Sequence, residues 1–271
     1  MSRLNTSPIA TVDYNAGRWE RETSQVIAEQ SVTLTVNNEP WLTFMCTPID
    51  VEALAVGFLF NEQFIGSFKE IASLRVCPEG DNIDVWLSHK VIKPDSWTRT
   101  SGCSGGNTSV GQFKLRTSAT KEKTGSLLTA EKISSLMEGL GKAQDLYREA
   151  GGVHTSAMSD GERIILVAED IGRHNTLDKL AGKLLLDKIK LTRRIILTTG
   201  RISSEMMQKA ARMKVAVVIS RTSPSSLSVQ MAEQLGITLI GYARGNRFTI
   251  YAHPERVISH VINEETQREA L

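Results

Sequence analysis

The chain has 271 residues, of which 41% are hydrophobic and 23% charged, so it can bury the core of one large domain or two smaller ones. No stretch approaches the roughly 18 consecutive apolar residues of a membrane span, and the N-terminus lacks the apolar segment of a signal peptide, so we expect a cytoplasmic protein. A net charge of +2 is too small for a general nucleic-acid-binding protein. Three cysteines without a CxxC pair argue against a disulfide framework and a four-cysteine zinc site.

The first hundred residues predict a mixed, sheet-rich domain, which we place at residues 1–112. Apolar and polar residues alternate on both sides of Asn37 and Asn38, a pattern typical of a β-hairpin. The segment 50–64 that follows has apolar residues at helical spacing, and residues 73–89 predict a second hairpin with Pro and Gly in its turn.

Two of the cysteines fall within these predicted strands. Because a free cysteine behaves as a small hydrophobe, we expect Cys46 and Cys77 to lie in the core.

The third cysteine, Cys103, lies in a polar, glycine-rich segment that predicts a mobile connection from about Thr98 to Leu128, with at most a short element at 110–115. No residue within five positions of this cysteine is apolar. Residues 90–123 hold seven basic and two acidic residues, a local balance of +5. We therefore expect an exposed, weakly ordered thiol in a positive field that favours its thiolate, with a passive loop cysteine as the alternative.

Residues 126–271 predict a three-layer α/β/α domain. A helical pattern over 129–151 precedes four short, branched runs, and each of the first three leads into a helix. The runs are 163–170, 193–199, 215–220 and 237–242. Strands that alternate with helices are typical of a parallel sheet covered on both faces, and the alternating pattern at 247–257 predicts an added edge strand.

The loops after these runs carry candidate binding residues, because ligands of such folds bind where loops leave the carboxyl ends of strands. We expect Asn175 to cap the helix after the first run, so that Arg173 and His174 stand just outside it. The loop after the second run offers Arg201 and Ser203 at a helix N-terminus, where backbone donors beside a guanidinium form an anion site in principle.

The loops after the third and fourth runs also carry arginines. Arg221 follows the third run with a serine cluster, where Ser223 and Pro224 predict the first helical turn and Gly236 the end of the helix. Arginines at one edge of the sheet predict a pocket for a polyanion such as a nucleotide or a phosphorylated cofactor. The five are Arg173, Arg201, Arg221, Arg244 and Arg247. Each of these residues also has an alternative interpretation. The serines could only cap their helices, the arginines could form exposed ion pairs at the rim of the sheet, and the histidine could have a structural role.

The histidines and Cys103 also bear on two hydrolytic reactions. A zinc deaminase needs H-x-E together with P-C-x-x-C, and the chain has no P-C-x-x-C, so we expect neither zinc nor hydrolytic deamination. A cysteine hydrolase would be expected to place its nucleophile on a strand-to-helix turn rather than in a glycine-rich connection.

Four segments resemble the FdhD family of formate dehydrogenase accessory sulfurtransferases, and the similarity covers most of residues 30–258. They are "TPIDVEALAVGFLFNEQFI" (47–65), "SGCSGG" (101–106), "EDIGRHNTLDKLAGKLL" (169–185) and the long run from "TTGRISSEMM" to "YAHPERV" (198–257). The resemblance implies a cytidine-deaminase-like α/β fold without the deaminase zinc motif, and a homodimer.

The resemblance also implies a function. Sulfur would pass from a cysteine desulfurase, as a persulfide on Cys103, to the bis-molybdopterin guanine dinucleotide form of the molybdenum cofactor, and formate dehydrogenase would then receive the cofactor. GDP would be a partial mimic of that cofactor. The family's cofactor contact in the last loop falls here on Tyr242, Ala243, Arg244, Gly245, Asn246 and Arg247. The loop arginines, with Ser203 and His174, would complete the cofactor site.

One residue departs from the family pattern: many members carry CxxC in this loop, whereas Gly106 stands here at the second position. A persulfide needs only one thiolate to attack the donor's terminal sulfur, so Cys103 alone can serve. Two other functions stay open. A non-catalytic cofactor chaperone would not depend on Cys103, and a nucleotide-processing enzyme would need neither a desulfurase nor a molybdoenzyme.

Overall fold

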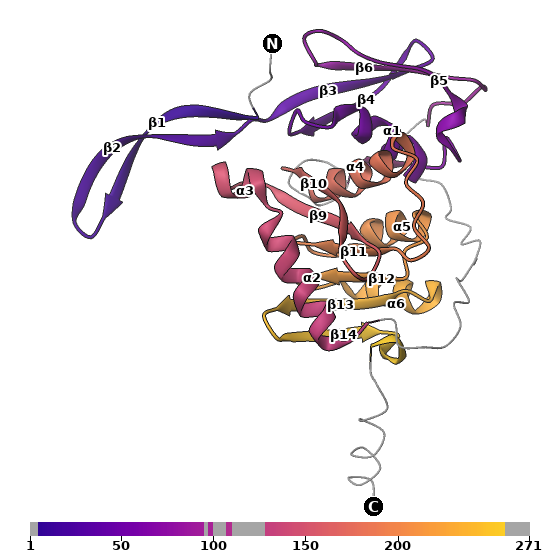
Figure 1. Cartoon of the computed structure of the whole chain (residues 1–271). Coiled ribbons are helices and arrows are strands. Elements are labelled where there is room, and N and C mark those ends of the chain that lie inside the picture. Colours follow the sequence, from indigo (N-terminus) through magenta and orange to yellow (C-terminus); the bar gives the residue numbers. More distant parts are fainter. Residues whose placement is uncertain (1–4, 95–96, 100–106, 110–127, 258–271) are drawn as a thin grey trace, which may run out of the picture. The chain divides into compact units, whose positions relative to one another are not determined.

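The computed structural model describes residues 5–94, 97–99, 107–109 and 128–257, which form two compact units (Figure 1). The first unit is drawn from Met1–Val110, Gln144–Thr155 and Ala168–Ile189, and the second from the remaining three segments. The domain boundaries expected from the sequence divide the chain once, between 112 and 126, whereas the contacts interleave the two units along the chain. Cys103 and the expected element at 110–115 lie outside the described residues.

The first unit contains a four-stranded sheet of order β4-β3-β6-β5. Its strands are β3 (Gln30–Val36), β4 (Glu39–Cys46), β5 (Ile71–Val76) and β6 (Asn82–Leu87). Both predicted hairpins are confirmed, and β3 pairs with β6 in parallel. Asn37 and Asn38 have φ angles of 49° and 68°, as a two-residue turn that follows the strand twist requires.

Two helices cross closely in this unit, α1 (Val51–Asn61) and α4 (Arg173–Leu186). A Cβ atom on Gly57 would lie 1.7 Å from the main-chain oxygen of Asp178, and one on Gly182 would lie 1.9 Å from that of Ala53. Only glycine fits at these two positions, because the obstructing atoms are backbone. The predicted helix at 50–64 is confirmed, and its apolar residues join the core of this unit.

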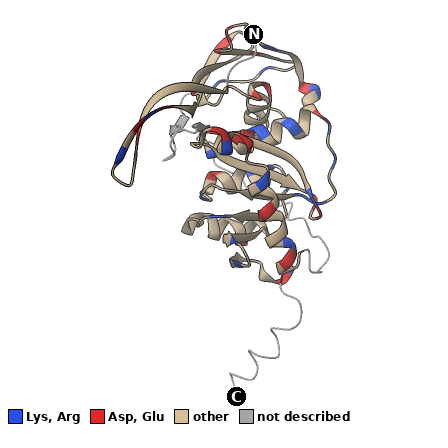
Figure 2. Cartoon of the chain, turned by 60° about the vertical axis from the view of Figure 1, so that its left-hand side comes forward, with Lys and Arg blue, Asp and Glu red and all other residues tan. Residues whose placement is uncertain are grey.

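A long hairpin of β1 (Thr6–Asn15) and β2 (Arg18–Ile27) precedes this sheet and was not expected from the sequence. Its tip carries Tyr14 and Trp19, whose rings are 4.9 Å apart and largely exposed. Charged residues of both signs lie along the hairpin (Figure 2). The unit also contains α3 (Asp145–Ala150), the 3-10 helix η1 (Phe68–Glu70) and a short pair of β7 (Trp97–Arg99) and β8 (Asn107–Ser109).

The second unit is built on a six-stranded sheet of order β10-β9-β11-β12-β13-β14. Its strands are β9 (His154–Ser159), β10 (Ile164–Asp170), β11 (Ile195–Thr198), β12 (Val217–Ser220), β13 (Thr238–Arg244) and β14 (Arg247–Ala252), and the residues of β9 and β10 divide between the units. The predicted parallel sheet holds for the three central strands, β11, β12 and β13. The predicted edge strand is β14, antiparallel to β13, while β9 was missed and runs antiparallel to β11.

Helices cover both faces of this sheet. Helix α2 (Ala130–Lys142) packs Ile133, Leu136 and Leu140 into one cluster with Ile195 and Leu197 of β11. Because side chains alternate along a strand, Ile196 faces the opposite side, where α5 (Ser204–Arg212) and α6 (Ser226–Leu235) lie (Figure 1). The α/β fold class is confirmed.

One helical element differs from the sequence expectation, and one was not expected. The helical pattern over 129–151 divides into α2 and α3, and the 3-10 helix η2 (Pro254–Arg256) follows β14. Among the residues that the structure describes, no helix has the length and apolar character to cross a membrane.

Candidate functional site

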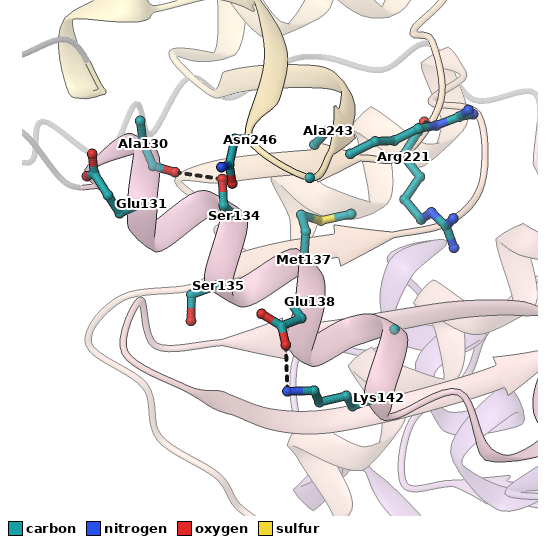
Figure 3. Close-up of a pocket in the computed structure, with 13 residues that line it drawn as sticks. Ala130, Glu131, Ser134, Ser135, Met137, Glu138, Lys142, Arg221, Ala243 and Asn246 are labelled. Atoms are coloured by element: carbon teal, nitrogen blue, oxygen red, sulfur yellow. Dashed lines mark hydrogen bonds and ion pairs between the residues drawn. The ribbon is translucent and has the colours of Figure 1, made fainter.

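A cavity of about 860 Å³ lies in the second unit between α2 and the segments that follow β12 and β13 (Figure 3). Arg221 lines it directly after β12, and the end of β13 together with the turn into β14 contributes four residues. These four are Ala243, Arg244, Gly245 and Asn246. Five of the residues proposed from the sequence thus share one cavity, because β12 and β13 are parallel neighbours whose carboxyl ends meet at one edge.

Two hydrogen bonds to main-chain oxygens hold these two segments together. Arg244 donates from Nε to the main-chain oxygen of Arg221 at 3.0 Å, and Tyr242 donates from its main-chain nitrogen to the oxygen of Thr222, also at 3.0 Å. Gly245 adopts a φ of 54°, which closes the tight turn into β14. The hydrogen bond from Arg244 holds the backbone of the loop that begins at Arg221.

The opposite wall of the cavity is a polar stripe of α2, which the sequence reasoning missed. It consists of Glu131, Ser134, Ser135, Glu138 and Lys142, spaced by three or four residues along one side of the helix. A polar stripe is typical of any amphipathic surface helix. Only the sheet topology places it across from the arginine loops, so the sequence pattern alone held no signal for it.

Both carboxylates of this stripe favour the ionised form. Lys142 lies 2.6 Å from Oε1 of Glu138, and its hydrogen bond and positive charge lower the pKa of that carboxyl group. Hydrogen bonds from its own backbone N–H and from the Thr129 hydroxyl lower the pKa of Glu131. The cavity therefore has an arginine wall and a facing wall with two carboxylates.

Four other predicted binding residues lie in this unit but do not line the cavity: Arg201, Ser203, Tyr242 and Arg247. Ser203 caps α5, because its hydroxyl accepts a hydrogen bond from the Met206 N–H at 3.4 Å, which confirms the capping interpretation. Arg201 and Arg247 are exposed, and Tyr242 is 48% exposed.

Helix α6 begins two residues later than expected. The sequence predicted a first turn at Ser223 and Pro224, but Ser225 is the N-cap and accepts from the Ser228 N–H at 3.2 Å. Ile202 instead forms a β-bridge with Pro224, which extends the segment before the helix. Gly236, with a φ of 65°, ends the helix as predicted.

Arg173 and His174 belong to the first unit, and the prediction that they stand outside their helix is wrong. Gly172 is the N-cap of α4, so both residues occupy its first turn, where they are 7% and 5% exposed. Asn175 is not a cap, because its Nδ2 donates to Asp170 Oδ1 at 2.8 Å and to the Met45 main-chain oxygen at 3.0 Å. The Asp170 carboxylate also accepts from the Gly172 N–H, at 2.7 Å.

A fully buried ion pair lies beneath this turn. Lys179 Nζ lies 2.6 Å from Asp170 Oδ2, and both side chains are 0% exposed. The ammonium also donates to the main-chain oxygens of Thr47 and Glu169, at 3.1 and 3.2 Å. The Thr47 N–H donates to the same carboxylate at 3.2 Å. The network ties the segment after β4 to the start of α4.

Cys46 is buried beside this network, as predicted. Burial raises the pKa of its thiol to about 12, with a further contribution from the negative charge of Asp170. The thiol therefore stays protonated and is not a nucleophile at neutral pH.

A model of the FdhD/NarQ family matches residues 27–258. The chain belongs to the FdhD/NarQ family. It is 34% identical to the sulfur carrier protein FdhD of Bacillus subtilis over 248 residues. This alignment covers 90% of this chain and 94% of that protein. The FdhD of Bacillus licheniformis is 36% identical over the same length. The crystal structure of a proposed formate dehydrogenase accessory protein from Desulfotalea psychrophila superposes with a TM-score of 0.76 at 26% identity, over 94% of this chain and all of that one.

The family match includes every residue of the cavity and of the buried network. It begins at Ile27, the last residue of β2, so nearly all of the β1–β2 hairpin precedes it. Cys103 also falls within the matched FdhD/NarQ region but lies outside the described residues.

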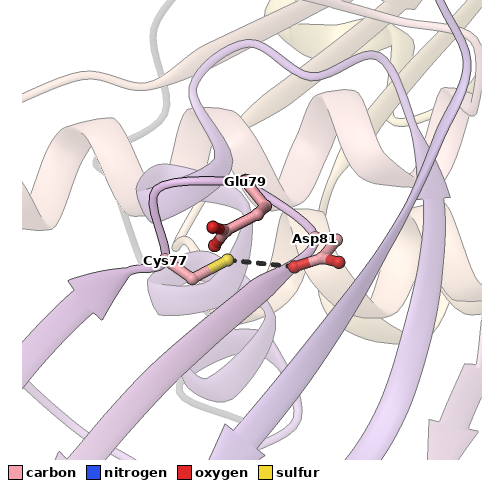
Figure 4. A group of neighbouring side chains, drawn as sticks. All are labelled: Cys77, Glu79 and Asp81. Atoms are coloured by element: carbon pink, nitrogen blue, oxygen red, sulfur yellow. Dashed lines mark hydrogen bonds between the residues drawn. The ribbon is translucent and has the colours of Figure 1, made fainter.

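Cys77 of this FdhD/NarQ chain is not a core residue, contrary to the sequence prediction. It follows the end of β5 in the hairpin turn and is partly exposed. Its Sγ donates to Asp81 Oδ1 at 3.0 Å and accepts from the N–H groups of Gly80 and Asn82, both at 3.2 Å. Ligand atoms of Cys77, Glu79 and Asp81 lie within 4.8 Å of one another (Figure 4), and the hydrogen bonds of the turn account for that grouping.

Proposed function

We propose that this protein is a sulfur carrier that accepts sulfur as a persulfide on Cys103 and transfers it to the bis-molybdopterin guanine dinucleotide form of the molybdenum cofactor. Two findings support the proposal. Relatives that cover nine-tenths of the chain are named sulfur carrier proteins, and a structural relative is described as a formate dehydrogenase accessory protein. The observation that carries it is the cavity into which Arg221 and Arg244 converge.

The cavity residues fit a guanine nucleotide. Guanidinium groups suit phosphate oxygens, because their planar array of donors forms paired, charge-assisted hydrogen bonds. Met137 and Ala243 supply apolar surface for a base between the two walls. A volume of about 860 Å³ is typical of a site for one small ligand. The cavity would therefore hold one guanine nucleotide end of the cofactor, which makes GDP a suitable probe.

Loading of sulfur follows thiol–disulfide chemistry. The Cys103 thiolate attacks the outer sulfur of the persulfide on a cysteine desulfurase; a new S–S bond forms, the old one breaks, and the desulfurase cysteine leaves as a thiolate. Neither described cysteine competes for this role, because Cys46 is buried with a pKa of about 12 and the Cys77 sulfur is engaged in its turn. The bound cofactor supplies the metal that receives the sulfur.

The proposal implies partners and a location. The protein meets a cysteine desulfurase and formate dehydrogenase, and we propose that it acts in the cytoplasm as a homodimer.

Mass spectrometry tests the proposal directly. The protein is incubated with a cysteine desulfurase and cysteine, digested without reductant, and its cysteine peptides are examined. We expect one added sulfur atom on the peptide that contains Cys103, and none on that of Cys46. Cys77→Ser is the control and should load as the wild type does. Sulfur absent from Cys103 while the desulfurase is active would contradict the carrier function.

A second candidate function is a cofactor-binding chaperone without sulfur transfer. The observation that favours it is Gly106, which leaves Cys103 as the one thiol of its loop. The same experiment separates the two functions, because a chaperone binds GDP without gaining sulfur.

A further inference from the structure

The two walls of the cavity differ in the chemistry they offer a ligand. Arg221 and Arg244 present donors and positive charge, which match phosphate. The α2 wall presents carboxylates, which only accept hydrogen bonds, and the hydroxyls of Ser134 and Ser135. A ligand that matches both walls has an anionic group at one end and hydrogen-bond donors at the other.

Nucleobases differ in whether they can satisfy an ionised carboxylate. Guanine has two adjacent donors, N1–H and the 2-amino group, and these match the two oxygens of one carboxylate. Adenine has a lone pair at N1 in the corresponding position, which a carboxylate repels, and it lacks the 2-amino group. Charge-assisted hydrogen bonds therefore favour a base that turns its donors toward the carboxylate, and repulsion disfavours one that turns a lone pair toward it.

Of the two carboxylates on this wall, Glu138 is placed to meet a base. It follows Met137, whose side chain lies on the cavity side of α2 near Arg221 (Figure 3). Lys142 lies 2.6 Å from its Oε1, and the Glu138 side chain is 67% exposed, so its carboxylate is accessible to a ligand. Glu131 is in the first turn of the helix, where its own backbone N–H and the Thr129 hydroxyl hold it.

We propose that Glu138 determines the base specificity of this cavity, by accepting hydrogen bonds from N1–H and the 2-amino group of guanine while the arginine loops hold the phosphates. The proposal rests on the proposed function, since it assumes that a guanine nucleotide enters this cavity. Lys142 orients the carboxylate through their ion pair. The cavity thus selects the guanine form of a nucleotide over the adenine form.

Calorimetric titration with three diphosphates tests the assignment, because they share the ribose and the diphosphate and differ only in the base. GDP has both donors, IDP lacks the 2-amino group, and ADP lacks both. For the wild type we expect the order GDP, IDP, ADP, with ADP bound about tenfold or more weakly than GDP, the loss that one charged hydrogen bond implies. For Glu138→Gln, which keeps the shape and loses the charge, we expect the GDP preference to fall to within about threefold.

The control is Glu162→Gln, the same change at a carboxylate that Lys132 engages at 2.6 Å but that does not line the cavity, and it should keep the wild-type order. A Glu138→Gln variant with an unchanged GDP-to-ADP ratio would overturn the assignment of Glu138, as would loss of the preference in Glu162→Gln alone. In both cases GDP binding by the wild type leaves the proposed function intact. Failure of the wild type to bind any of the three would instead contradict the nucleotide cavity itself.

Discussion

Arg244 donates a hydrogen bond from its Nε to the main-chain oxygen of Arg221, 23 residues earlier in the sequence, at 3.0 Å. The bond joins the last residue of β13 to the segment that follows β12, its parallel neighbour. Arg244 therefore has two roles in the proposed site: its charge faces the cavity, and its Nε–H positions the loop that carries the second arginine.

Removal of the Arg244 guanidinium should accordingly weaken nucleotide binding more than removal of Arg221. We expect Arg221→Gln to lower the affinity for GDP about tenfold, the effect of one charged hydrogen bond, and Arg244→Gln to lower it further. Calorimetry measures both. The matched control is Arg201→Gln, at an exposed arginine that does not line the cavity, and its affinity should stay within about twofold of the wild type. A larger loss in Arg201→Gln than in Arg244→Gln would place the nucleotide elsewhere.

The crossing of α1 and α4 should tolerate no side chain at Gly57. Its added Cβ would overlap the main-chain oxygen of Asp178, at 1.7 Å, and backbone cannot move aside as a flexible side chain can. We expect Gly57→Ala to lower the free energy of unfolding by about 3 kcal/mol or more, at or above the upper end for overpacked cores. Urea unfolding followed by circular dichroism measures the change.

The control for this crossing is Gly141→Ala in the last turn of α2, where an added Cβ meets nothing within 4 Å. Alanine should leave the stability there unchanged or raise it by about 0.5–1 kcal/mol. Equal stability of the two variants would mean that the helices can separate at no cost.

The buried ion pair should be essential to the first unit. Lys179→Met leaves the Asp170 carboxylate without its ammonium partner at a fully buried site. We expect a loss of about 3–5 kcal/mol in the free energy of unfolding, as is typical when one partner of a buried pair is removed. Lys183→Met, one turn later on α4, breaks a partly exposed ion pair with Asp50 and should cost about 1 kcal/mol. Similar losses in both variants would contradict the central role of the buried pair.

The buried thiol of Cys46 should make the free energy of unfolding fall at alkaline pH. Its pKa is raised from 9.0 to about 12 in the folded protein, so between these values the unfolded chain loses this proton and the folded protein keeps it. The thiol thus has no effect on stability below pH 9 and favours unfolding increasingly up to pH 12, by about 1.4 kcal/mol per pH unit. We expect the stability of the wild type to fall more steeply over this range than that of Cys46→Ala, and parallel slopes would contradict the raised pKa.

The sequence predicted the elements whose local pattern and packing agree. The turn at Asn37 and Asn38 and the apolar face of α1 are examples, because turn chemistry and periodicity act over a few residues. The prediction that loop arginines meet at one edge of the sheet holds for Arg221 and Arg244, since parallel neighbours bring their carboxyl ends together, whereas the other three predicted arginines do not line the cavity.

Other features left no recognisable pattern in the local sequence. Residues Thr6–Ile27 carry few apolar residues in alternation, so the β1–β2 hairpin was missed. The carboxylate of Asp170 binds both Asn175 and Lys179, and this moved the start of α4 ahead of the expected cap. The sulfur of Cys77 accepts hydrogen bonds from the backbone of its turn, so the cysteine lies in the turn and not in the expected core.

The carrier function depends most on Cys103, and complementation tests it in cells that lack the native protein. Cys103→Ser and, as a control, Cys77→Ser are expressed at equal levels, and formate dehydrogenase activity is measured together with GDP binding by the purified variants. The account predicts that Cys77→Ser restores full activity, whereas Cys103→Ser keeps wild-type GDP affinity and restores no activity above the empty-vector background. Full activity with Cys103→Ser would contradict sulfur transfer and leave the chaperone function.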